Sequence, residues 1–334
     1  MQYKKLGDSG LAVSRLCLGT MPFGNPEGQG ESLETAAEVI RGFIRAGGTF
    51  IDTADVYAGG RSEETVGRIV KEFARDTLVL ATKAGFPIGS DPNARGLSRK
   101  HLLASVESSL RRLQTDYIDL FYLHMWDPLV PISETVRAMD DLVRQGKVRY
   151  FGFSNFSGWQ AMKIHMAAKE SNIPFIAAQY QYSLIVRDIE YELPGLCETE
   201  GIGLVPWAPL GGGFLSGAYS SSTRQQHDGQ SGDVVQEKWF RRASERNWRI
   251  LQIAEQLAGR NGTDVLQISL AWLLARPSVD SVIISARSRE QLEANLAAVD
   301  VHLAESELQQ LNDAGKPVDL YPYRMIEQHS GKGL

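Results

Sequence analysis

The sequence contains few cysteines and no long hydrophobic run, and both absences limit what the protein can be. Only two cysteines, Cys17 and Cys197, occur among 334 residues, and each stands alone in an apolar context, which favours a reducing compartment. No run approaches the roughly 18 apolar residues of a transmembrane helix, and the opening MQYKKLGDSG lacks the apolar core of a signal peptide. We therefore expect a soluble, cytoplasmic protein with no membrane contact.

Basic clusters and metal-binding motifs are also absent. The formal net charge is −5 and the chain has no block of about five basic residues, so nothing predicts binding to nucleic acid. The six histidines are scattered and form no HExxH or Cys/His cluster, so no metal site is predicted. What remains is an ordinary globular composition, 43% hydrophobic and 22% charged.

Strand-like and helix-like patterns alternate through most of the chain. Residues 3–16 predict a hairpin that turns at Asp8-Ser9-Gly10. An apolar stripe with 3–4 spacing after Ser98 predicts one helix, and residues 135–143 predict another that ends before Gly146. The eight predicted strands end near Thr20, Asp52, Lys83, His124, Asn155, Gln179, Pro206 and Ser285.

Eight βα units without a break in composition predict an α/β fold, a single (β/α)8 TIM barrel that spans residues 1–334 as one domain. A doubly wound sheet is the alternative, but it would usually carry a Gly-x-Gly-x-x-Gly turn after its first strand, and residues 18–22 read LGTMP. Two long segments, 86–98 and 217–246, follow predicted strands, so we expect them at the C-terminal face of the barrel.

Four polar residues stand where apolar strands end. Asp52, Lys83 and His124 close successive strands, and Tyr57 follows Asp52 by five residues. Such groups are costly at buried positions and converge on one rim of a parallel barrel, where together they suit proton transfer. An ammonium on Lys83 would lower the pKa of Tyr57, and Asp52 would keep Lys83 charged.

These residues also have other interpretations. Asp52 and Lys83 could form a buried structural pair beside a core tyrosine. Lys83 could form a Schiff base with a carbonyl substrate, which needs a neutral amine. As a neutral imidazole, His124 could donate a hydrogen bond to a carbonyl oxygen.

Eight motifs occur in an order that resembles the aldo-keto reductases, NAD(P)-dependent oxidoreductases built on the (β/α)8 barrel. They are LCLGTMPFG (16–24), FIDTADVY (50–57), ATK (81–83), DYIDLFYLH (116–124), GFSNF (152–156), QYQYSL (179–184), PWAPLGGGFLSG (206–217) and ARSREQLEANL (286–296). The resemblance implies that Tyr57 is the general acid and Lys83, paired with Asp52, assists it. His124 would orient the carbonyl that receives a hydride from the nicotinamide. The chain is also similar to the potassium-channel β subunits of the same superfamily.

The resemblance further implies a binding site for NADPH or NADP+, with NADH possible. Ser154, Asn155 and Gln179 would bind the carboxamide, Trp207 would stack on the nicotinamide, and residues 210–215 would wrap the pyrophosphate. Arg287 and Arg289 flank a predicted helix N-terminus and favour the 2′-phosphate, although Ser288 and Gln291 also fit a purely structural capping box. The implied cofactor residues are Gly19, Thr20, Ser154, Asn155, Gln179, Trp207, Pro209, Leu210, Gly211, Gly213, Leu215, Ser285, Arg287, Arg289, Gln291 and Asn295.

The substrate pocket is expected to be apolar and aromatic. Met21, Phe23 and Trp126 follow predicted strands at the rim and would surround a small carbonyl or alcohol beside Tyr57. The expected activity is therefore reduction of aldehydes and ketones, or the reverse oxidation of an alcohol or sugar. Two alternatives are a nucleotide-binding regulatory subunit with little turnover and a Schiff-base lyase acting through Lys83. Whether the protein is a monomer or a homo-oligomer, and what the tail from Pro317 does, stay open.

Overall fold

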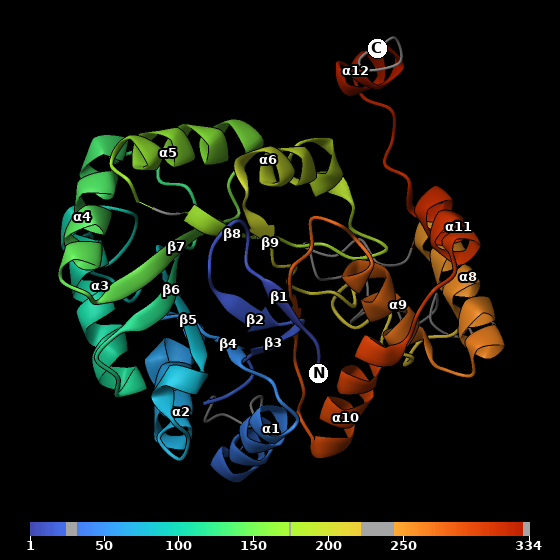
Figure 1. The fold of residues 1–334 in the computed structure, drawn as a ribbon, viewed down its shortest axis with the longest axis horizontal. Helices are drawn as coiled ribbons and strands as arrows, with labels where there is room; N and C mark the ends of the chain where they lie inside the picture. The colour runs from blue at the N-terminus through green and yellow to red at the C-terminus, as the bar shows by residue number, and fades with distance from the viewer. Residues whose placement is uncertain (25–31, 174, 222–243, 330–334) are drawn as a thin grey trace.

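The computed structural model describes residues 1–24, 32–173, 175–221 and 244–329 (Figure 1). Its strands are β1 (Tyr3–Lys5), β2 (Ala12–Ser14), β3 (Leu16–Gly19), β4 (Phe50–Asp52), β5 (Val79–Ala84), β6 (Ile118–Leu123), β7 (Val148–Ser154), β8 (Phe175–Gln179), β9 (Gly203–Leu204) and β10 (Val282–Ile284). The α-helices are α1 (Leu33–Arg45), α2 (Arg61–Val70), α3 (Arg99–Leu113), α4 (Ile132–Arg144), α5 (Gly158–Glu170), α6 (Leu193–Glu200), α8 (Glu245–Asn261), α9 (Val265–Leu274), α10 (Arg289–Ala297), α11 (Glu305–Gly315) and α12 (Tyr323–His329). Short 3-10 turns are η1 (Tyr57–Gly60), η2 (Arg75–Thr77), η3 (Asp188–Tyr191) and η5 (Ala298–Asp300).

Eight parallel strands form a barrel, as the sequence predicts. Their order is β10-β3-β4-β5-β6-β7-β8-β9. The two ends of this sheet meet where Leu204 bridges Val279 and the Ile283 N–H donates to the Pro206 carbonyl at 2.9 Å. The strands end within one or two residues of their predicted ends, and the helices lie around the outside (Figure 1). The prediction of a (β/α)8 barrel is confirmed.

The predicted N-terminal hairpin is also confirmed, and it closes one end of the barrel. Strands β1 and β2 pair antiparallel, with Tyr3 opposite Ser14. The fully buried side chains of Leu6 and Val13 pack with residues of the barrel interior such as Phe50. Figure 1 shows the hairpin across the middle of the ring. Because the hairpin fills the end where the strands begin, an open site is left to the other end.

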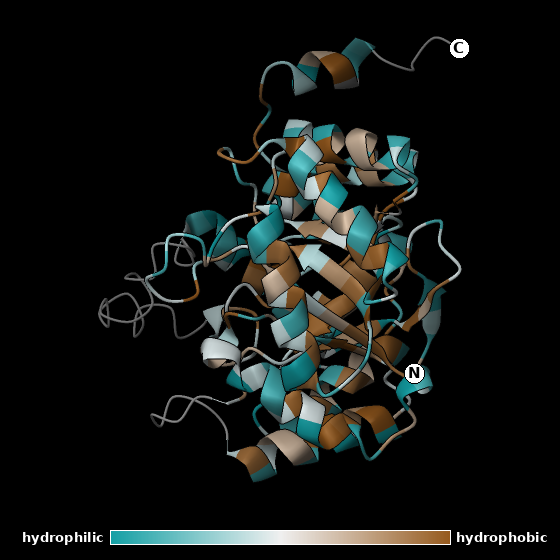
Figure 2. Ribbon diagram, turned by 90° about the vertical axis from the view of Figure 1, so that its left-hand side faces the viewer, coloured by the Kyte–Doolittle hydropathy of each residue, from teal (hydrophilic) through white to brown (hydrophobic). Residues whose placement is uncertain are grey.

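The outer core lies between the strands and the inward faces of the helices, where Figure 2 shows most hydrophobic residues. Helix α3 illustrates the local causes: the side chain of Ser98 caps its first turn by accepting from the His101 N–H, and the buried stripe predicted from the sequence faces inward. Helix α4 begins at Ile132, three residues before its predicted start, with Pro131 at the N-cap position and no side-chain cap. Among the described residues, no helix is long and apolar enough to cross a membrane.

The structure describes one of the two long segments completely and the other only in part. Residues 86–98 follow β5 and precede α3, so they lie at the C-terminal face as expected. Within the segment 217–246, residues 222–243 lie outside the described residues. The tail leads to α12, which projects from the side of the barrel near α6 (Figure 1). It is anchored there by the Tyr323 hydroxyl, which donates to Glu192 at 2.8 Å, and not over the strand ends.

Candidate active site

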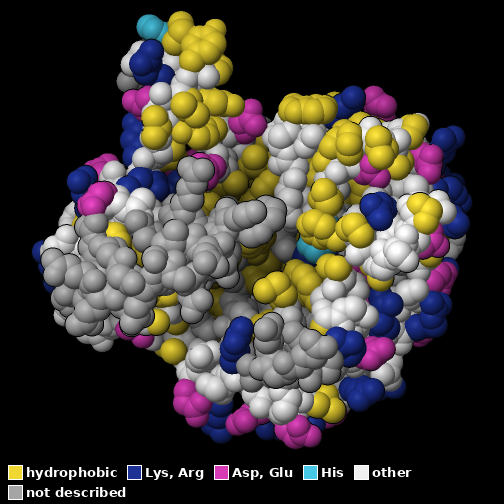
Figure 3. All heavy atoms as spheres, turned by 180° about the vertical axis from the view of Figure 1, so that it is seen from behind, with side chains coloured by type: hydrophobic (Ala, Val, Ile, Leu, Met, Phe, Trp, Pro, Cys, Tyr) yellow, Lys and Arg dark blue, Asp and Glu magenta, His cyan; other side chains and the backbone are white. Residues whose placement is uncertain are grey.

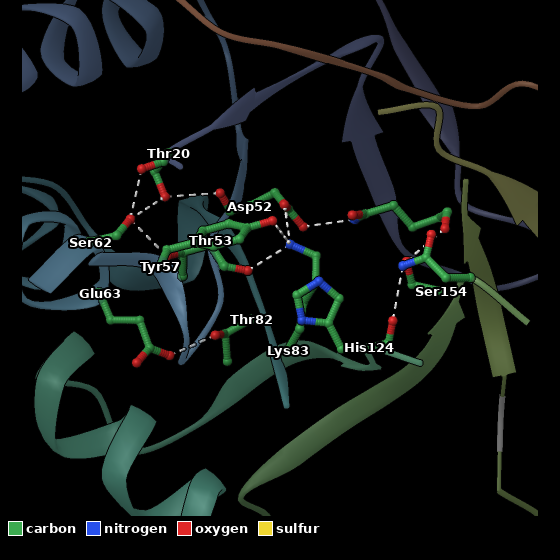
Figure 4. A network of polar contacts seen from close by, with 12 residues as sticks. Thr20, Asp52, Thr53, Tyr57, Ser62, Glu63, Thr82, Lys83, His124 and Ser154 are labelled. Atoms are coloured by element: carbon green, nitrogen blue, oxygen red, sulfur yellow. Dashed lines mark hydrogen bonds and ion pairs between the residues drawn. The ribbon is translucent and has the colours of Figure 1, made fainter. Parts of the chain in front are cut away.

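The four polar residues singled out from the sequence meet at one rim of the barrel (Figure 4). The Lys83 ammonium lies at their centre: it donates to Asp52 Oδ1 at 2.5 Å and to Tyr57 Oη at 3.2 Å. The His124 ring stands edge-on to that of Tyr57, with 6.1 Å between centroids. Lys83 is fully buried, and Asp52 and His124 are nearly so. The rim therefore holds one buried ion pair, one phenol and one imidazole.

A strained turn places Tyr57 beside Lys83. Asp52 ends β4, and five residues later η1 turns the chain through three consecutive left-handed residues, Ala58, Gly59 and Gly60, with φ of 50°, 64° and 93°. The two glycines adopt this conformation readily, whereas Ala58 does so at a cost. Helix α2 begins at the next residue, so the turn is held between β4 and a regular helix.

Charge and burial set the protonation state of Lys83. Burial alone lowers the pKa of this amine, but the attraction of Asp52 and of the Tyr57 oxygen outweighs burial and raises it. The ammonium also donates to the Thr53 carbonyl at 2.8 Å, so Lys83 is a charged group with three oxygen partners. A Schiff base requires a neutral, accessible amine, and this environment disfavours it.

Tyr57 and His124 are both neutral at physiological pH. Burial raises the pKa of Tyr57; Lys83 acts in the opposite direction, as the sequence led us to expect, but does not offset the burial. Burial also lowers the pKa of His124 well below its ordinary value, and the charge on Lys83 lowers it further. A protonated phenol and a neutral imidazole are both hydrogen-bond donors, which suits them to a carbonyl oxygen.

The residues expected at the nicotinamide lie directly beside these groups. Gln179 ends β8 and its amide Nε2 donates to Asp52 Oδ2 at 2.9 Å. The Ser154 hydroxyl donates to the Gln179 carbonyl at 2.8 Å, and Asn155 Nδ2 donates to the His124 carbonyl at 3.0 Å. Trp207, partly buried, packs against the interior of the barrel from the end of β9. Gly19 ends β3 and Thr20 follows it; both are buried, and the Thr20 hydroxyl donates to the Asp52 carbonyl.

The glycine-rich segment after β9 forms tight turns. Gly211, Gly212 and Gly213 are all left-handed, with φ of 56°, 64° and 95°. The N–H groups of Gly211 and Gly213 donate within the segment to the carbonyls of Ala208 and Leu210, and the Leu215 N–H also donates to Leu210. The side chain of Leu215 and the ring of Pro209 are buried. Three of the N–H groups expected at a pyrophosphate thus stabilise the turn itself.

The region expected at the adenosine has structural hydrogen bonds of its own. Ser288 caps α10 by accepting from the Gln291 N–H, and Gln291 Oε1 accepts from the Arg287 N–H at 2.9 Å. Arg289 pairs with Glu293, and the buried Asn295 donates to the carbonyl of Ser285 at 3.1 Å. Ser285, Arg287 and Arg289 are exposed, so their side chains are accessible from solvent.

The residues expected to contact the substrate differ in how far they are exposed to solvent. Met21 is 67% exposed, and Trp126 is partly buried, with its ring edge-on to those of Phe156 and Trp159. The structure places Phe23 away from solvent: its side chain is fully buried in the outer core. Figure 3 shows a hollow lined with hydrophobic side chains and a histidine side chain on its floor. Sequence reasoning missed Phe86, whose ring stands edge-on to His124 with 4.4 Å between centroids.

A buried polar cluster behind the rim was also missed. Glu63, fully buried, accepts from the Thr82 hydroxyl at 2.6 Å and pairs with Arg112 at 2.6 Å (Figure 4). Asp55 is buried beside this pair. The cluster joins α2 and α3 to the residue before Lys83 on β5. Its signal in the sequence is weak: Glu63 and Arg112 are single charged residues on helix-forming segments, which solvent exposure explains equally well.

Eight parallel strands with titratable groups gathered at their carboxyl ends define the class of barrel proteins whose active sites lie at that face. Comparison with known proteins narrows the class: the chain belongs to the aldo/keto reductase family, whose model matches residues 15–316. Proteins of this family are oxidoreductases that use NAD(P)H and act on small carbonyl compounds.

Several relatives are similar over almost their whole length. Versiconal hemiacetal acetate reductase of Aspergillus parasiticus is 33% identical, over 96% of this chain and 99% of that protein. L-glyceraldehyde 3-phosphate reductase of Escherichia coli is 34% identical over 92% and 94%, and a probable voltage-gated potassium channel subunit beta of Arabidopsis thaliana is 35% identical over 90% and 92%. A similar solved structure is the crystal structure of a thermostable aldo-keto reductase in complex with the inhibitor epalrestat. The two sequences are 33% identical, the match covers 94% of this chain and all of that one, and the TM-score is 0.75.

Proposed function

We propose that this protein is an NADPH-dependent carbonyl reductase that converts aldehydes and ketones of modest polarity to alcohols, or runs the reverse oxidation, in the cytoplasm. The observation that carries the proposal is the placement of the Lys83 ammonium between Asp52 and the Tyr57 hydroxyl, 3.2 Å from the latter, with a neutral His124 alongside. We propose that residues 1–334 form a single domain that carries this site.

The proton chemistry follows from the states of these groups. A bound nicotinamide would supply the hydride, and the carbonyl oxygen would gain negative charge as the hydride arrives. The protonated Tyr57 donates its proton to that oxygen, and the Lys83 ammonium stabilises the phenolate that remains. Asp52 keeps Lys83 charged and directed at the phenol. His124 donates a hydrogen bond that orients the carbonyl before transfer.

The residues beside this set fit a nicotinamide. A carboxamide has both donors and acceptors, and Ser154, Asn155 and Gln179 offer both at the end of two adjacent strands. Trp207 presents an aromatic ring at the end of β9 for stacking. The exposed Arg287 and Arg289, at the start of α10, favour a cofactor that carries a 2′-phosphate. We therefore expect NADPH to be preferred to NADH.

The decisive experiment is NADPH oxidation with a panel of aldehydes and ketones, comparing the wild type with Tyr57→Phe. Loss of a general acid lowers kcat by roughly 10²- to 10⁴-fold, whereas NADPH affinity should hardly change. Tyr191→Phe is the matched control, because Tyr191 lies on the outer surface and its hydroxyl donates to the Val318 carbonyl. Equal rates for the wild type and Tyr57→Phe would refute the acid role.

A second candidate function is a nucleotide-binding regulatory subunit, favoured by the similarity to a probable channel subunit beta. The same assay separates the two. Tight NADPH binding without turnover on any carbonyl would favour the regulatory role, and turnover that depends on Tyr57 would favour the reductase.

A further inference from the structure

The direction of the His124 ring at the rim requires an explanation. Its Nδ1 atom is buried and, within the part of the chain that the structure describes, has no hydrogen-bond partner. The hydrogen bonds at His124 fix its backbone: its N–H donates to the Ala84 carbonyl at 2.9 Å, and its own carbonyl accepts from Asn155 at 3.0 Å. A histidine that orients a ligand often has its second ring nitrogen bonded to a carboxylate or a carbonyl. Here another contact must direct the ring.

The direction of the ring matters because one particular nitrogen has to serve the reaction. A neutral imidazole carries a single N–H, and the burial of Nδ1 leaves Nε2 to donate to a carbonyl oxygen. The torsion that joins the ring to Cβ has broad, roughly two-fold preferences, so the bond itself does not select one orientation. A half-turn would put a carbon where Nε2 has to lie. Packing therefore has to select the productive orientation.

Two aromatic rings pack edge-on against the imidazole of His124. The ring of Phe86 is the closer, with 4.4 Å between centroids and an interplanar angle of 77°, and the ring of Tyr57 lies at 6.1 Å. Edge-on packing is a favoured arrangement of aromatic rings, and it is lost when either ring turns. Tyr57 is the expected proton donor, whereas Phe86 has no group that reacts. The contact with Phe86 is therefore the one whose part in the site is unexplained.

The backbone holds Phe86 against the histidine. Strand β5 ends at Ala84, and Gly85 follows with a φ of 142°, a conformation that residues with a side chain rarely adopt. The Gly85 carbonyl accepts from the Gly96 N–H at 2.9 Å, which closes the base of the loop that carries Phe86. Phe86 thus lies at the closed base of this loop, directly after the end of a barrel strand, where its position is well determined.

We propose that Phe86 is a positioning residue for the reductase site, whose ring packs edge-on against His124 and keeps Nε2 directed at the carbonyl oxygen. This inference rests on the proposed function, in which His124 orients the carbonyl. The same contact helps to keep the imidazole buried, since His124 is only 6% exposed while Phe86 itself is partly buried. Phe86 acts through His124 and takes no part in proton or hydride transfer.

The test is a double-mutant cycle with Phe86→Leu and His124→Gln, in which NADPH oxidation is followed with a short aliphatic aldehyde. Leucine keeps an apolar side chain at the position but removes the flat ring. We expect Phe86→Leu to lower kcat/KM roughly 10-fold in the wild type, which corresponds to the upper strength of an edge-on aromatic pair. In His124→Gln the same change should alter kcat/KM less than about twofold, because no imidazole is left to direct.

Phe73→Leu is the matched control. Phe73 is also partly buried, but it packs against the outer core after the last residue of α2, at the end of the barrel where the strands begin. This variant should keep the kcat/KM of the wild type. The proposal is overturned if Phe86→Leu also keeps it. It is equally overturned if Phe86→Leu lowers kcat/KM by the same factor with and without His124, because Phe86 would then act on the substrate or on the fold.

A second measurement applies if the wild type reduces no carbonyl, in which case the proposed function fails separately, or if His124→Gln is too slow to assay. NMR titration of the His124 ring, assigned by its absence in His124→Gln, then decides. Burial and the charge on Lys83 both lower the pKa of His124, and Phe86→Leu changes only the burial, so this pKa should rise toward its ordinary value of 6.5. Phe73→Leu should leave it unchanged. An equal pKa in the wild type and Phe86→Leu would refute the role.

Discussion

Replacing Asp55 with asparagine should change how the stability of the protein depends on pH. Asp55 follows β4 and is 1% exposed. Burial raises the pKa of its carboxyl from 3.8 to about 7, and the charge on Glu63 adds to this, while Arg112 and the Ser105 hydroxyl offset only part. The folded protein therefore holds a proton on Asp55 that the unfolded chain releases at a much lower pH.

The sign and size of the effect follow from proton linkage. Between 3.8 and about 7 the folded state binds more protons than the unfolded state, so the free energy of unfolding falls as pH rises through this window. The window spans about three pH units, and at about 1.4 kcal/mol per unit the full effect is about 4 kcal/mol. About 3 kcal/mol of this lies between pH 5 and pH 8. Above the window the loss is complete and constant.

Urea unfolding of the wild type and Asp55→Asn at pH 5 and pH 8 would measure this effect. The histidines and other carboxyls titrate in both proteins, so the difference between the two pH dependences isolates Asp55. The wild type should lose about 3 kcal/mol more than the variant between these pH values, and the variant should be the more stable protein at pH 8. Parallel pH dependences would refute the reasoning, because they would mean that Asp55 is ionised in the folded protein at pH 5.

Three further predictions concern the rim and its support. Arg112→Met should lower the free energy of unfolding by about 3–5 kcal/mol, because it leaves the buried Glu63 unpaired. The double variant with Glu63→Gln should recover part of this free energy, and urea unfolding that shows no recovery would contradict the pairing. Because burial keeps His124 neutral, kcat/KM of the wild type and of His124→Gln should depend on pH in the same way near pH 6.5. A limb near pH 6.5 that is present in the wild type and absent in the variant would contradict this. Alcohol oxidation needs the phenolate of Tyr57, whose pKa burial raises, so its rate should still be rising at about pH 8; a plateau below about pH 7 would contradict this.

The positions of the rim residues could be predicted because each departs from a local rule. Asp52, Lys83 and His124 interrupt apolar runs at the points where strands end, and the strand ends in the structure fall within one or two residues of those points. A parallel barrel then brings the groups together without further information. The position of Tyr57 at the rim could be predicted because it follows Asp52 by only five residues. The left-handed turn that directs its side chain could not be predicted, because the turn includes Ala58, a residue that rarely adopts this conformation.

Other features depend on contacts between distant residues. Phe23 follows a strand, as a pocket residue would, but the chain turns back at Thr20, whose carbonyl accepts from the Phe23 N–H at 3.0 Å, and the ring enters the core. Glu63 and Arg112 are 49 residues apart and lie on different helices. Each alone resembles a solvated charge, so neither could be assigned to a buried pair.

Burial and charge act on the rim residues in different combinations, and the combinations set the protonation states. For Lys83, charge outweighs burial and the amine is positive. For Tyr57, burial outweighs the charge of Lys83 and the phenol keeps its proton; for His124 the two act together and the imidazole is neutral. One ammonium held by Asp52 thus lies beside two neutral donors. A carbonyl oxygen needs donors before the hydride arrives and a proton afterwards, so this resting pattern is the one that the proposed reduction requires, without any prior proton transfer.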